Sequence, residues 1–144
     1  MALVYATAVA LDGQGVLLLG PSGSGKSDLA LRLIDEGALL ISDDQVEVTR
    51  DEGAFFASPP QPIAGLIEIR GVGLLRLPYL TRSLLALAVE LVPAPLVERL
   101  PDPATWTGGG ITLPLLRLDP FAASTPAKLR LALKVGPLSI MRAQ

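Results

Sequence analysis

Near the start of the chain, a short glycine-rich segment has the residue types and spacing of a phosphate-binding loop. Gly20, Gly25, Lys26 and Ser27 fit the pattern G-x-x-x-x-G-K-[ST]. The pattern comes directly after the apolar run 16–19, which is typical of a buried strand. Glycines let the backbone turn tightly and aim successive N–H groups inward, and the dipole of a following helix adds positive charge there. The expected nucleotide-binding residues are Gly20, Pro21, Ser22, Gly23, Ser24, Gly25, Lys26 and Ser27.

The lysine and the serine of this loop have separate expected roles. Lys26 places its ammonium against the β- and γ-phosphates of a nucleotide, and the hydroxyl of Ser27 helps to hold Mg²⁺. An ordinary glycine-rich turn between a strand and a helix is the alternative interpretation. Because the spacing, the lysine and the serine all coincide with the expected strand and helix, the sequence favours phosphate binding.

Asp43 and Asp44 follow a second apolar run, residues 38–41. Between the two runs, residues 27–36 place their apolar side chains on one face of a helix that Gly37 closes. Such a compact unit predicts parallel strands whose carboxyl ends lie at the phosphate loop, so both aspartates are expected at that edge. Acidic residues there commonly bind metal or polarise a nucleophile in phosphoryl transfer, and Asp43 is the candidate metal ligand. A solvated Asp-Asp turn is the alternative.

The segment 65–77, GLIEIRGVGLLRL, is the second informative stretch. If it is extended, Glu68 and Arg70 share one face about 6–7 Å apart, while Ile67 and Ile69 pack on the other. Glu68 is then placed to complete the Mg²⁺ shell and Arg70 to neutralise phosphate oxygens. A simple ion pair at the edge of a sheet is the alternative, and residue types alone do not decide between the two.

The remaining segments predict an α/β fold with a mixed, strand-rich sheet in a single domain, residues 1–144. Tyr5 falls on the first strand, where its propensity favours a half-buried aromatic residue. A C-terminal helix is expected with Thr125 as its N-cap and Pro126 in its first turn, running to Lys134. The other expected elements are strands at 3–11, 46–49, 55–56, 84–92 and 111–118, a hairpin turn at 12–15, one helical turn at 96–100 and a loop at 102–110.

Composition narrows the chemistry further. The 144 residues include no cysteine and no histidine, which excludes disulfides and thiol catalysis and leaves proton transfer to Asp, Glu, Lys or Tyr. A net charge of −2 gives no broad attraction to nucleic acid or to an anionic membrane. The mean hydropathy of +0.50 is high, yet the apolar runs are too short to span a bilayer, so we expect subunits to associate through apolar surface. Residues 1–15 lack the pattern of a signal peptide, and the cytoplasm is the expected location.

Three segments together resemble one family. GPSGSGKSDLALRLI, LLISDDQVEV and LIEIRGVGLL, in this order, are similar to the catalytic domain of bacterial HPr kinase/phosphorylase. The resemblance covers residues 3–99 well and the rest loosely, and it corresponds to a short form without the separate N-terminal domain of the family. It implies a P-loop (Walker A) kinase domain with the fold shared by HPr kinase and phosphoenolpyruvate carboxykinase.

The resemblance also implies an activity. Family members are ATP-dependent kinases that phosphorylate a serine of the phosphocarrier protein HPr and also remove this phosphate with inorganic phosphate. Lys26 and Ser27 would then serve ATP and Mg²⁺, Asp44 would accept the proton of the serine hydroxyl, and Glu68 would contribute to Mg²⁺ binding. Arg99 is similar to a catalytic arginine of the family. A hexamer is the expected assembly.

The sequence departs from the family pattern at two places, which limits how far the family's activity can be expected of this chain. Tyr5 stands where the family has a histidine, and the arginine-rich C-terminal motif is recognisable only as Pro114 and Arg117. Because tyrosine does not titrate near neutral pH, we expect the kinase reaction to survive better than phosphorolysis. The rivals are a small-molecule kinase or nucleotide hydrolase, and a nucleotide-binding regulatory module without transfer activity. The presence of Lys26, Asp44 and Glu68 argues against the second rival.

Overall fold

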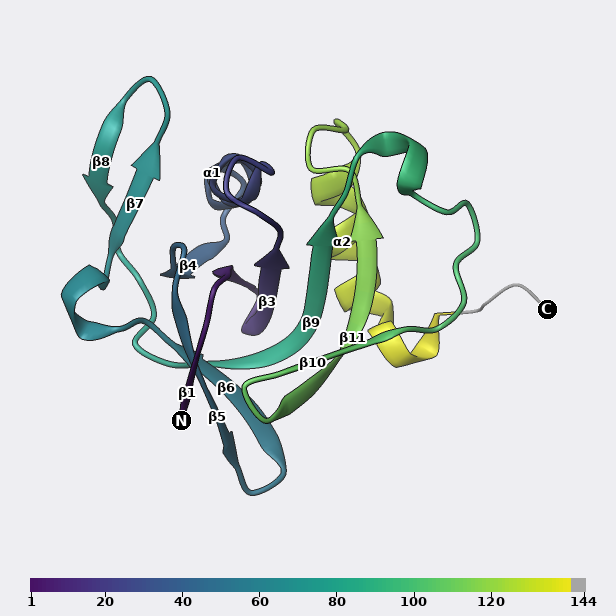
Figure 1. Cartoon of the computed structure of the whole chain (residues 1–144), viewed down its shortest axis with the longest axis horizontal. Coiled ribbons are helices and arrows are strands. Elements are labelled where there is room, and N and C mark those ends of the chain that lie inside the picture. Colours follow the sequence, from purple (N-terminus) through teal and green to yellow (C-terminus); the bar gives the residue numbers. More distant parts are fainter. Residues whose placement is uncertain (141–144) are drawn as a thin grey trace.

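In the computed structural model, which describes residues 1–140, a curled sheet is flanked by two helices and a separate hairpin (Figure 1). Short 3₁₀ turns occupy Gln61–Ile63, Ala94–Leu96 and Pro137–Ser139. The helices are α1 (Lys26–Asp35) and α2 (Thr125–Val135). The strands are β1 (Ala2–Val4), β2 (Thr7–Leu11), β3 (Gln14–Leu19), β4 (Leu39–Ser42), β5 (Val46–Asp51), β6 (Ala54–Ser58), β7 (Leu66–Ile69), β8 (Gly73–Arg76), β9 (Ser83–Leu91), β10 (Thr105–Gly108) and β11 (Ile111–Leu118).

Strand β9 joins the two parts of the curled sheet. Its first residues, Ser83 and Leu84, pair antiparallel with β6, which continues through β5 to β1. Its later residues pair in parallel with β3 on one side and with β11 on the other, and β10 adds to β11. The long strand bends between these two sets of partners (Figure 1). The α/β class and the mixed, strand-rich sheet expected from the sequence are confirmed.

One edge of this sheet collects the ends of several strands. Strand β2 lies between β3 and β4 and pairs antiparallel with both, so β3 and β4 run in the same direction, as the sequence predicts. Strands β9 and β11 are parallel to β3. The carboxyl ends of β3, β4, β9 and β11 and the amino end of β2 therefore lie at one edge. We call this the upper edge, as it lies in Figure 1.

The central strands are buried on both faces, which explains why they are continuous apolar runs. In β3, Val16 and Leu18 point to the face that α1 and α2 cover, whereas Leu17 points to the opposite face, inside the curl made with β5 and β6. All three side chains have no exposed surface. Replacement of a leucine in such a position by alanine costs about 2–5 kcal/mol.

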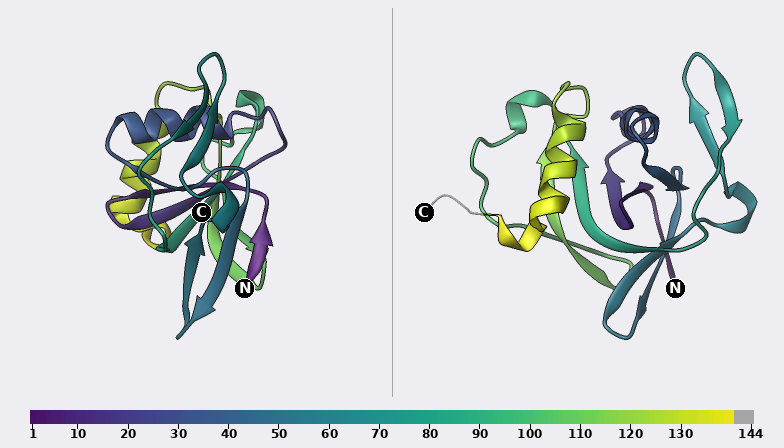
Figure 2. Two further views of the ribbon diagram at one scale, coloured as in Figure 1. Left: turned by 90° about the vertical axis from the view of Figure 1, so that its left-hand side faces the viewer. Right: turned by 180° about the vertical axis from the view of Figure 1, so that it is seen from behind.

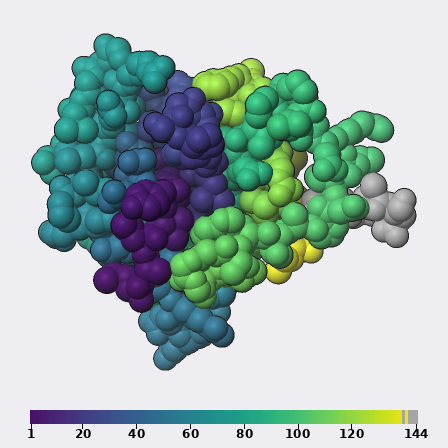
Figure 3. Space-filling model, viewed as in Figure 1, coloured from purple at the N-terminus to yellow at the C-terminus, as the bar shows by residue number. Residues whose placement is uncertain are grey.

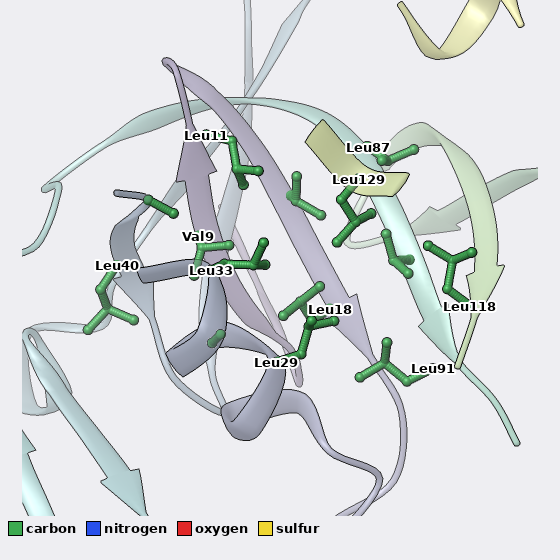
Figure 4. Packing of buried hydrophobic residues seen from close by; sticks show 14 of the residues in the cluster. Val9, Leu11, Leu18, Leu29, Leu33, Leu40, Leu87, Leu91, Leu118 and Leu129 are labelled. Atoms are coloured by element: carbon green, nitrogen blue, oxygen red, sulfur yellow. The ribbon is translucent and has the colours of Figure 1, made fainter. Parts of the chain in front are cut away.

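The two helices cover one face of the sheet. Helix α1 packs through Leu29 and Leu33, which lie beside Leu18 and Val9 (Figure 4). It ends at Asp35 with Glu36 as its C-cap, and Gly37 follows with a φ of 108°, in the left-handed region that glycine tolerates. Helix α2 runs along the sheet (Figure 2). Its Leu129 and Leu133, among others, belong to the same core.

The segment 65–77 forms a hairpin instead of one extended stretch. Strands β7 and β8 pair antiparallel and stand beside α1 (Figure 1). The expected alternation is confirmed: Ile67 and Ile69 are buried, whereas Glu68 and Arg70 are exposed. Arg70 lies one residue past the end of β7, in the turn.

Several sequence predictions of local structure are wrong. The expected first strand breaks at Tyr5 and Ala6, because β1 pairs with β5 whereas β2 pairs with β3 and β4. The expected loop at 102–110 contains β10, which pairs with β11 through a turn at Gly109 and Gly110. The expected helical turn at 96–100 is replaced by the 3₁₀ turn Ala94–Leu96 and non-helical chain beyond it. The cap of α2 is one residue earlier, at Ser124.

Candidate nucleotide and acceptor site

The predicted phosphate loop, residues 20–27 and called the phosphate loop below, lies at the upper edge, between the end of β3 and the start of α1. Gly23 and Gly25 have φ values of 81° and 103°, which side-chain-bearing residues rarely adopt. Gly25 is the N-cap of α1, and its carbonyl accepts the N–H of Leu29 at 2.9 Å. The loop is closed on itself where the N–H of Ser24 donates to the carbonyl of Pro21 at 3.0 Å. The backbone N–H groups at the start of α1 thus face the loop.

Lys26 and Ser24 give this loop its polar interior. The ammonium of Lys26 lies over the loop and donates to the carbonyls of Gly20 at 2.5 Å and Pro21 at 3.3 Å. The hydroxyl oxygen of Ser24 is buried and has no hydrogen-bond partner among the described residues. It lies so close to Gly20 that a Cβ added there would come within 2.4 Å of it. A buried polar atom without a partner is costly, and a phosphate oxygen held by the loop would supply one.

Asp43 is the best-connected side chain of the site. Its Oδ1 accepts hydrogen bonds from the hydroxyls of Ser27 at 2.8 Å and Thr7 at 2.9 Å. Its Oδ2 accepts the backbone N–H of Glu68 at 3.2 Å. Only 9% of Asp43 is exposed. One carboxylate therefore joins the start of β2, the phosphate loop, the end of β4 and β7.

Ser27 and Asp43 fit a metal site of the kind found in P-loop proteins. In those proteins the loop hydroxyl and an aspartate after a neighbouring strand hold Mg²⁺ together. Mg²⁺ prefers oxygen ligands and keeps several waters, so two side chains and the phosphates suffice. The 2.8 Å contact brings both oxygens to one point beside the loop. No group of three or more His, Cys, Asp or Glu side chains gathers here or elsewhere in the described part of the chain, so the candidate site consists of one carboxylate and one hydroxyl.

Asp44 differs from Asp43 in burial and in hydrogen bonding. Its side chain is exposed and accepts no hydrogen bond from the described residues. Its backbone has a φ of 69°, a left-handed conformation that aspartate tolerates better than most residues. Its N–H donates to the hydroxyl oxygen of Thr7 at 3.2 Å. Asp44 is thus a solvent-facing carboxylate directly after a buried one.

Three further predicted site residues lie at or near the same edge. Glu68 has its main chain against Asp43 and its side chain exposed, and Arg70 follows in the turn of the hairpin. Tyr5 precedes Thr7 by two residues and so lies at the amino end of β2. The expectation that Tyr5 is half-buried is wrong, since 69% of it is exposed where the chain passes from β1 to β2.

Arg99 lies apart from these residues. It is exposed in the chain after the 3₁₀ turn Ala94–Leu96, and its neighbours Glu98, Pro101 and Asp102 line a small hollow against β11. Strands β9, β3 and β2 separate β11 from β4, which makes a path on the order of 19 Å along the sheet, at about 4.8 Å per strand. Arg117 is engaged elsewhere, with Glu90 at 2.7 Å. Pro114 pairs with Thr105 on the β10 side.

Two residues of the site have no signal in the sequence. Thr7 is fully buried, and its hydroxyl contacts both Asp43 and Asp44. It looks like any β-branched strand residue until β2 is paired with β4. Phe121 lies against Gly25, since a Cβ added to that glycine would be 2.9 Å from its Cζ. That contact depends on how the loop after β11 folds back over the start of α1.

Comparisons with known proteins identify the family of this chain. The family model of the HPr serine kinase C-terminal domain matches residues 2–80. Among curated relatives, the HPr kinase/phosphorylase of Caldicellulosiruptor bescii is 46% identical over 72 residues, which are 49% of this chain and 23% of the relative. That of Streptococcus thermophilus is 44% identical over 73 residues, 50% of this chain and 24% of the relative. This chain therefore matches only about a quarter of the length of these relatives.

The fold has a counterpart among solved structures. The HPr(Ser) kinase/phosphatase from Coxiella burnetii superposes with a TM-score of 0.81 at 24% identity, covering 93% of this chain and 89% of that one. A coverage of 93% means that the similarity extends beyond residue 80, where the family match ends. Within residues 1–140, no helix is long and apolar enough to cross a membrane.

Proposed function

The chain belongs to the family of the HPr serine kinase C-terminal domain, and from that premise we propose that it is the catalytic domain of an ATP- and Mg²⁺-dependent serine kinase. Its acceptor is HPr or a related phosphocarrier protein. The observation that carries the proposal is the 2.8 Å contact between Ser27 and Asp43 beside the phosphate loop. An open carboxylate, Asp44, follows directly.

In this proposal the chain binds the triphosphate and orients the acceptor. The loop N–H groups, the buried hydroxyl of Ser24 and the ammonium of Lys26 hold the phosphates and neutralise their charge. Mg²⁺, held by Ser27 and Asp43, supplies further neutralisation of the phosphate oxygens when it is bound.

Asp44 is the proposed proton acceptor. Both oxygens of Asp43 already accept hydrogen bonds, whereas the carboxylate of Asp44 faces solvent and is open to an incoming serine. The serine oxygen forms a bond to the γ-phosphorus, the bond from that phosphorus to the β-phosphate oxygen breaks, and ADP leaves. The hydroxyl proton passes to Asp44. Glu68 is a further metal ligand in this proposal, since its backbone N–H meets Asp43 and its side chain is exposed. Arg70, exposed two residues later, is the proposed contact to phosphate oxygens.

Tyr5 provides a hydrogen-bonding group at the edge where the family has a histidine. A phenol can donate to a phosphate oxygen but cannot exchange protons as imidazole does near neutral pH. We therefore expect phosphorolysis of the phosphorylated carrier to be slow relative to its formation.

The test is transfer to a purified HPr, followed by intact mass spectrometry after incubation with ATP and Mg²⁺. Asp44→Asn should bind ATP as the wild type does and lose most transfer, about 10²–10⁴-fold. Asp12→Asn, in the exposed turn between β2 and β3, is the matched control and should keep full transfer. Unchanged transfer in Asp44→Asn rejects this residue as the base. Phosphate transferred to a small molecule or to water, but not to HPr, rejects the protein acceptor.

Arg99 requires a separate explanation because of its distance from Asp44. We propose that it acts on a neighbouring copy in a homo-oligomer, of which a hexamer is the expected form. The exposed apolar side chains Leu96 and Leu100 beside it, exposed by 62% and 58%, suit such a contact.

Mixing two inactive variants tests this arrangement. Lys26→Ala and Arg99→Ala should each be poor kinases, whereas their mixture should regain transfer because one copy supplies the phosphate loop and the other supplies the arginine. A mixture no more active than its components would show that Arg99 does not act between copies.

A further inference from the structure

Phe121 is an exposed aromatic residue held directly against the phosphate loop. About 65% of it is exposed, although large aromatic side chains usually gain by burial. A Cβ added to Gly25 would lie 2.9 Å from Cζ of Phe121 and 3.0 Å from Cβ of Pro120. One part of the ring therefore touches the loop backbone, and the rest faces solvent. Figure 3 shows the segment that contains Phe121, in yellow-green, beside the dark blue phosphate loop and α1.

The segment that carries this ring is fixed by several hydrogen bonds. The N–H of Phe121 donates to Oδ1 of Asp119 at 2.9 Å, and the hydroxyl of Thr125 donates to the carbonyl of Asp119 at 2.5 Å. The guanidinium of Arg32, from α1, donates to the carbonyl of Pro120, which is itself buried. These bonds fix the backbone that carries the ring, while the ring itself remains largely exposed. Stability alone does not require the ring to be aromatic there.

The order of the strands tells which end of a nucleotide would meet Phe121. Asp43 and Asp44 follow β4, whereas Phe121 follows β11, and β3 with its phosphate loop lies between these two strands in the sheet. A triphosphate in the loop with its terminal phosphate toward Asp43 and Asp44 must direct its nucleoside away from them. The nucleoside then leaves on the side of Phe121.

We infer that the ring of Phe121 is a stacking platform for the base of the nucleotide. This inference rests on the proposed function and adds to it the part of the ligand that the phosphate loop does not hold. Every base has a π-face, so stacking tolerates different bases, but a purine offers a larger face than a pyrimidine. The platform accordingly selects purine nucleoside triphosphates over pyrimidine ones.

The experiment compares ATP with inorganic tripolyphosphate, which has the phosphates but no base. Calorimetry in the presence of Mg²⁺ gives both dissociation constants for the wild type and for Phe121→Ala. The variant should bind ATP about 5- to 100-fold more weakly, the effect of losing one stacked base, and should bind tripolyphosphate within about twofold of the wild type. The same substitution should weaken the binding of UTP less than the binding of ATP.

Two further variants separate stacking from support of the loop. Phe121→Trp keeps a flat ring and should bind ATP at least as well as the wild type. Phe121→Leu keeps an apolar contact with Gly25 and should bind ATP as weakly as the alanine variant. Leu131→Ala, at an exposed position on the outer side of α2, is the control and should change neither constant.

The outcomes are distinct. If Phe121→Ala weakens ATP and tripolyphosphate equally, the ring only supports the loop and the inference is overturned. It is overturned as well if neither constant changes. A wild-type protein that takes up neither probe overturns the proposed nucleotide site itself, and the base platform with it.

Discussion

The two sides of the phosphate loop are built in different ways. On the β4 side, two hydrogen bonds join one side chain to another, since Ser27 and Thr7 both donate to the carboxylate of Asp43, in addition to the bonds from main-chain N–H groups. On the β11 side, side chains hold the main chain: Arg32 and Thr125 donate to the carbonyls of Pro120 and Asp119. A contact between two side chains restricts both residue types, whereas a carbonyl is offered by any residue.

This difference explains what a sequence reveals about each side. The β4 side lies within residues 2–80, which the family model matches, and its residues carry a readable motif. The β11 side lies outside that range and is recognised only through the fold. The proposed division of function, with catalysis on the β4 side and ligand selection on the β11 side, can be tested by substitutions on each side.

The largest effect is expected for the group that both sides share. Lys26→Ala removes the ammonium over the loop and should lower phosphoryl transfer about 10²–10³-fold, as loss of one charge-stabilising group typically does. Transfer to HPr followed by mass spectrometry measures it. Lys134→Ala, exposed in the last turn of α2, is the matched control. A loss of only about twofold in Lys26→Ala would mean that the loop does not hold the reacting phosphate.

The two neighbouring aspartates should separate stability from catalysis. Asp43→Asn and Asp44→Asn should both lose transfer, but only Asp43→Asn should lower the free energy of unfolding, by about 1–3 kcal/mol. The reason is that Asp43 accepts three hydrogen bonds near the core, whereas the carboxylate of Asp44 accepts none from the described residues. Urea unfolding measures the difference. Equal losses of stability in the two variants would contradict the division between a structural and a solvent-facing carboxylate.

Gly25 and Gly23 form a matched pair for the contact with the β11 side. Both have positive φ, so alanine should cost about 1–2 kcal/mol at either position. At Gly25 the added methyl also meets Phe121 and Pro120, whereas at Gly23 nothing lies within 4 Å. Gly25→Ala should therefore melt at a lower temperature than Gly23→Ala, and Phe121→Ala should remove part of that gap. Identical melting temperatures would mean that the β11 segment does not press on the loop.

The smallest effect is expected for the ion pair of Arg117 with Glu90. Both side chains are nearly half exposed, at 47% and 45%, so the 2.7 Å contact is screened by water and salt. Arg117→Ala should lower the free energy of unfolding by about 0.2–1 kcal/mol and less in high salt. A larger loss of ATP binding than of stability would instead give Arg117 a direct part in ligand binding.

Local patterns account for the parts of the fold that were predictable. The loop between β3 and α1 combines an apolar run, glycines and a lysine within a short stretch, and the two aspartates follow the next apolar run. The carboxyl ends of β3 and β4 meet at one edge because parallel strands do so. Simple alternation along the segment predicts that Glu68 and Arg70 are exposed, as the structure has them.

The features of the fold and of the site that the sequence does not predict arise from pairings between distant segments. The strand break at Tyr5 exists because β1 and β2 have different partners, and no residue there signals a break. Strand β10 is short and leads into the glycines of the turn at 109–110, and its pairing with β11 overrides a composition typical of loops. The contacts of Thr7 and Phe121 arise only when β2 is set beside β4 and the chain after β11 returns to α1.

The hydroxyl of Thr7 links the backbone at Asp44 to the carboxylate of Asp43. Its single hydroxyl donates its proton to Asp43 and accepts the N–H of Asp44, so both bonds pass through one oxygen atom. Any protein that presses on the exposed turn at Asp44 and shifts its amide must also alter the bond on the carboxylate that Ser27 shares. If the chain acts as proposed, binding of the acceptor at Asp44 would therefore also affect the candidate metal ligands Ser27 and Asp43.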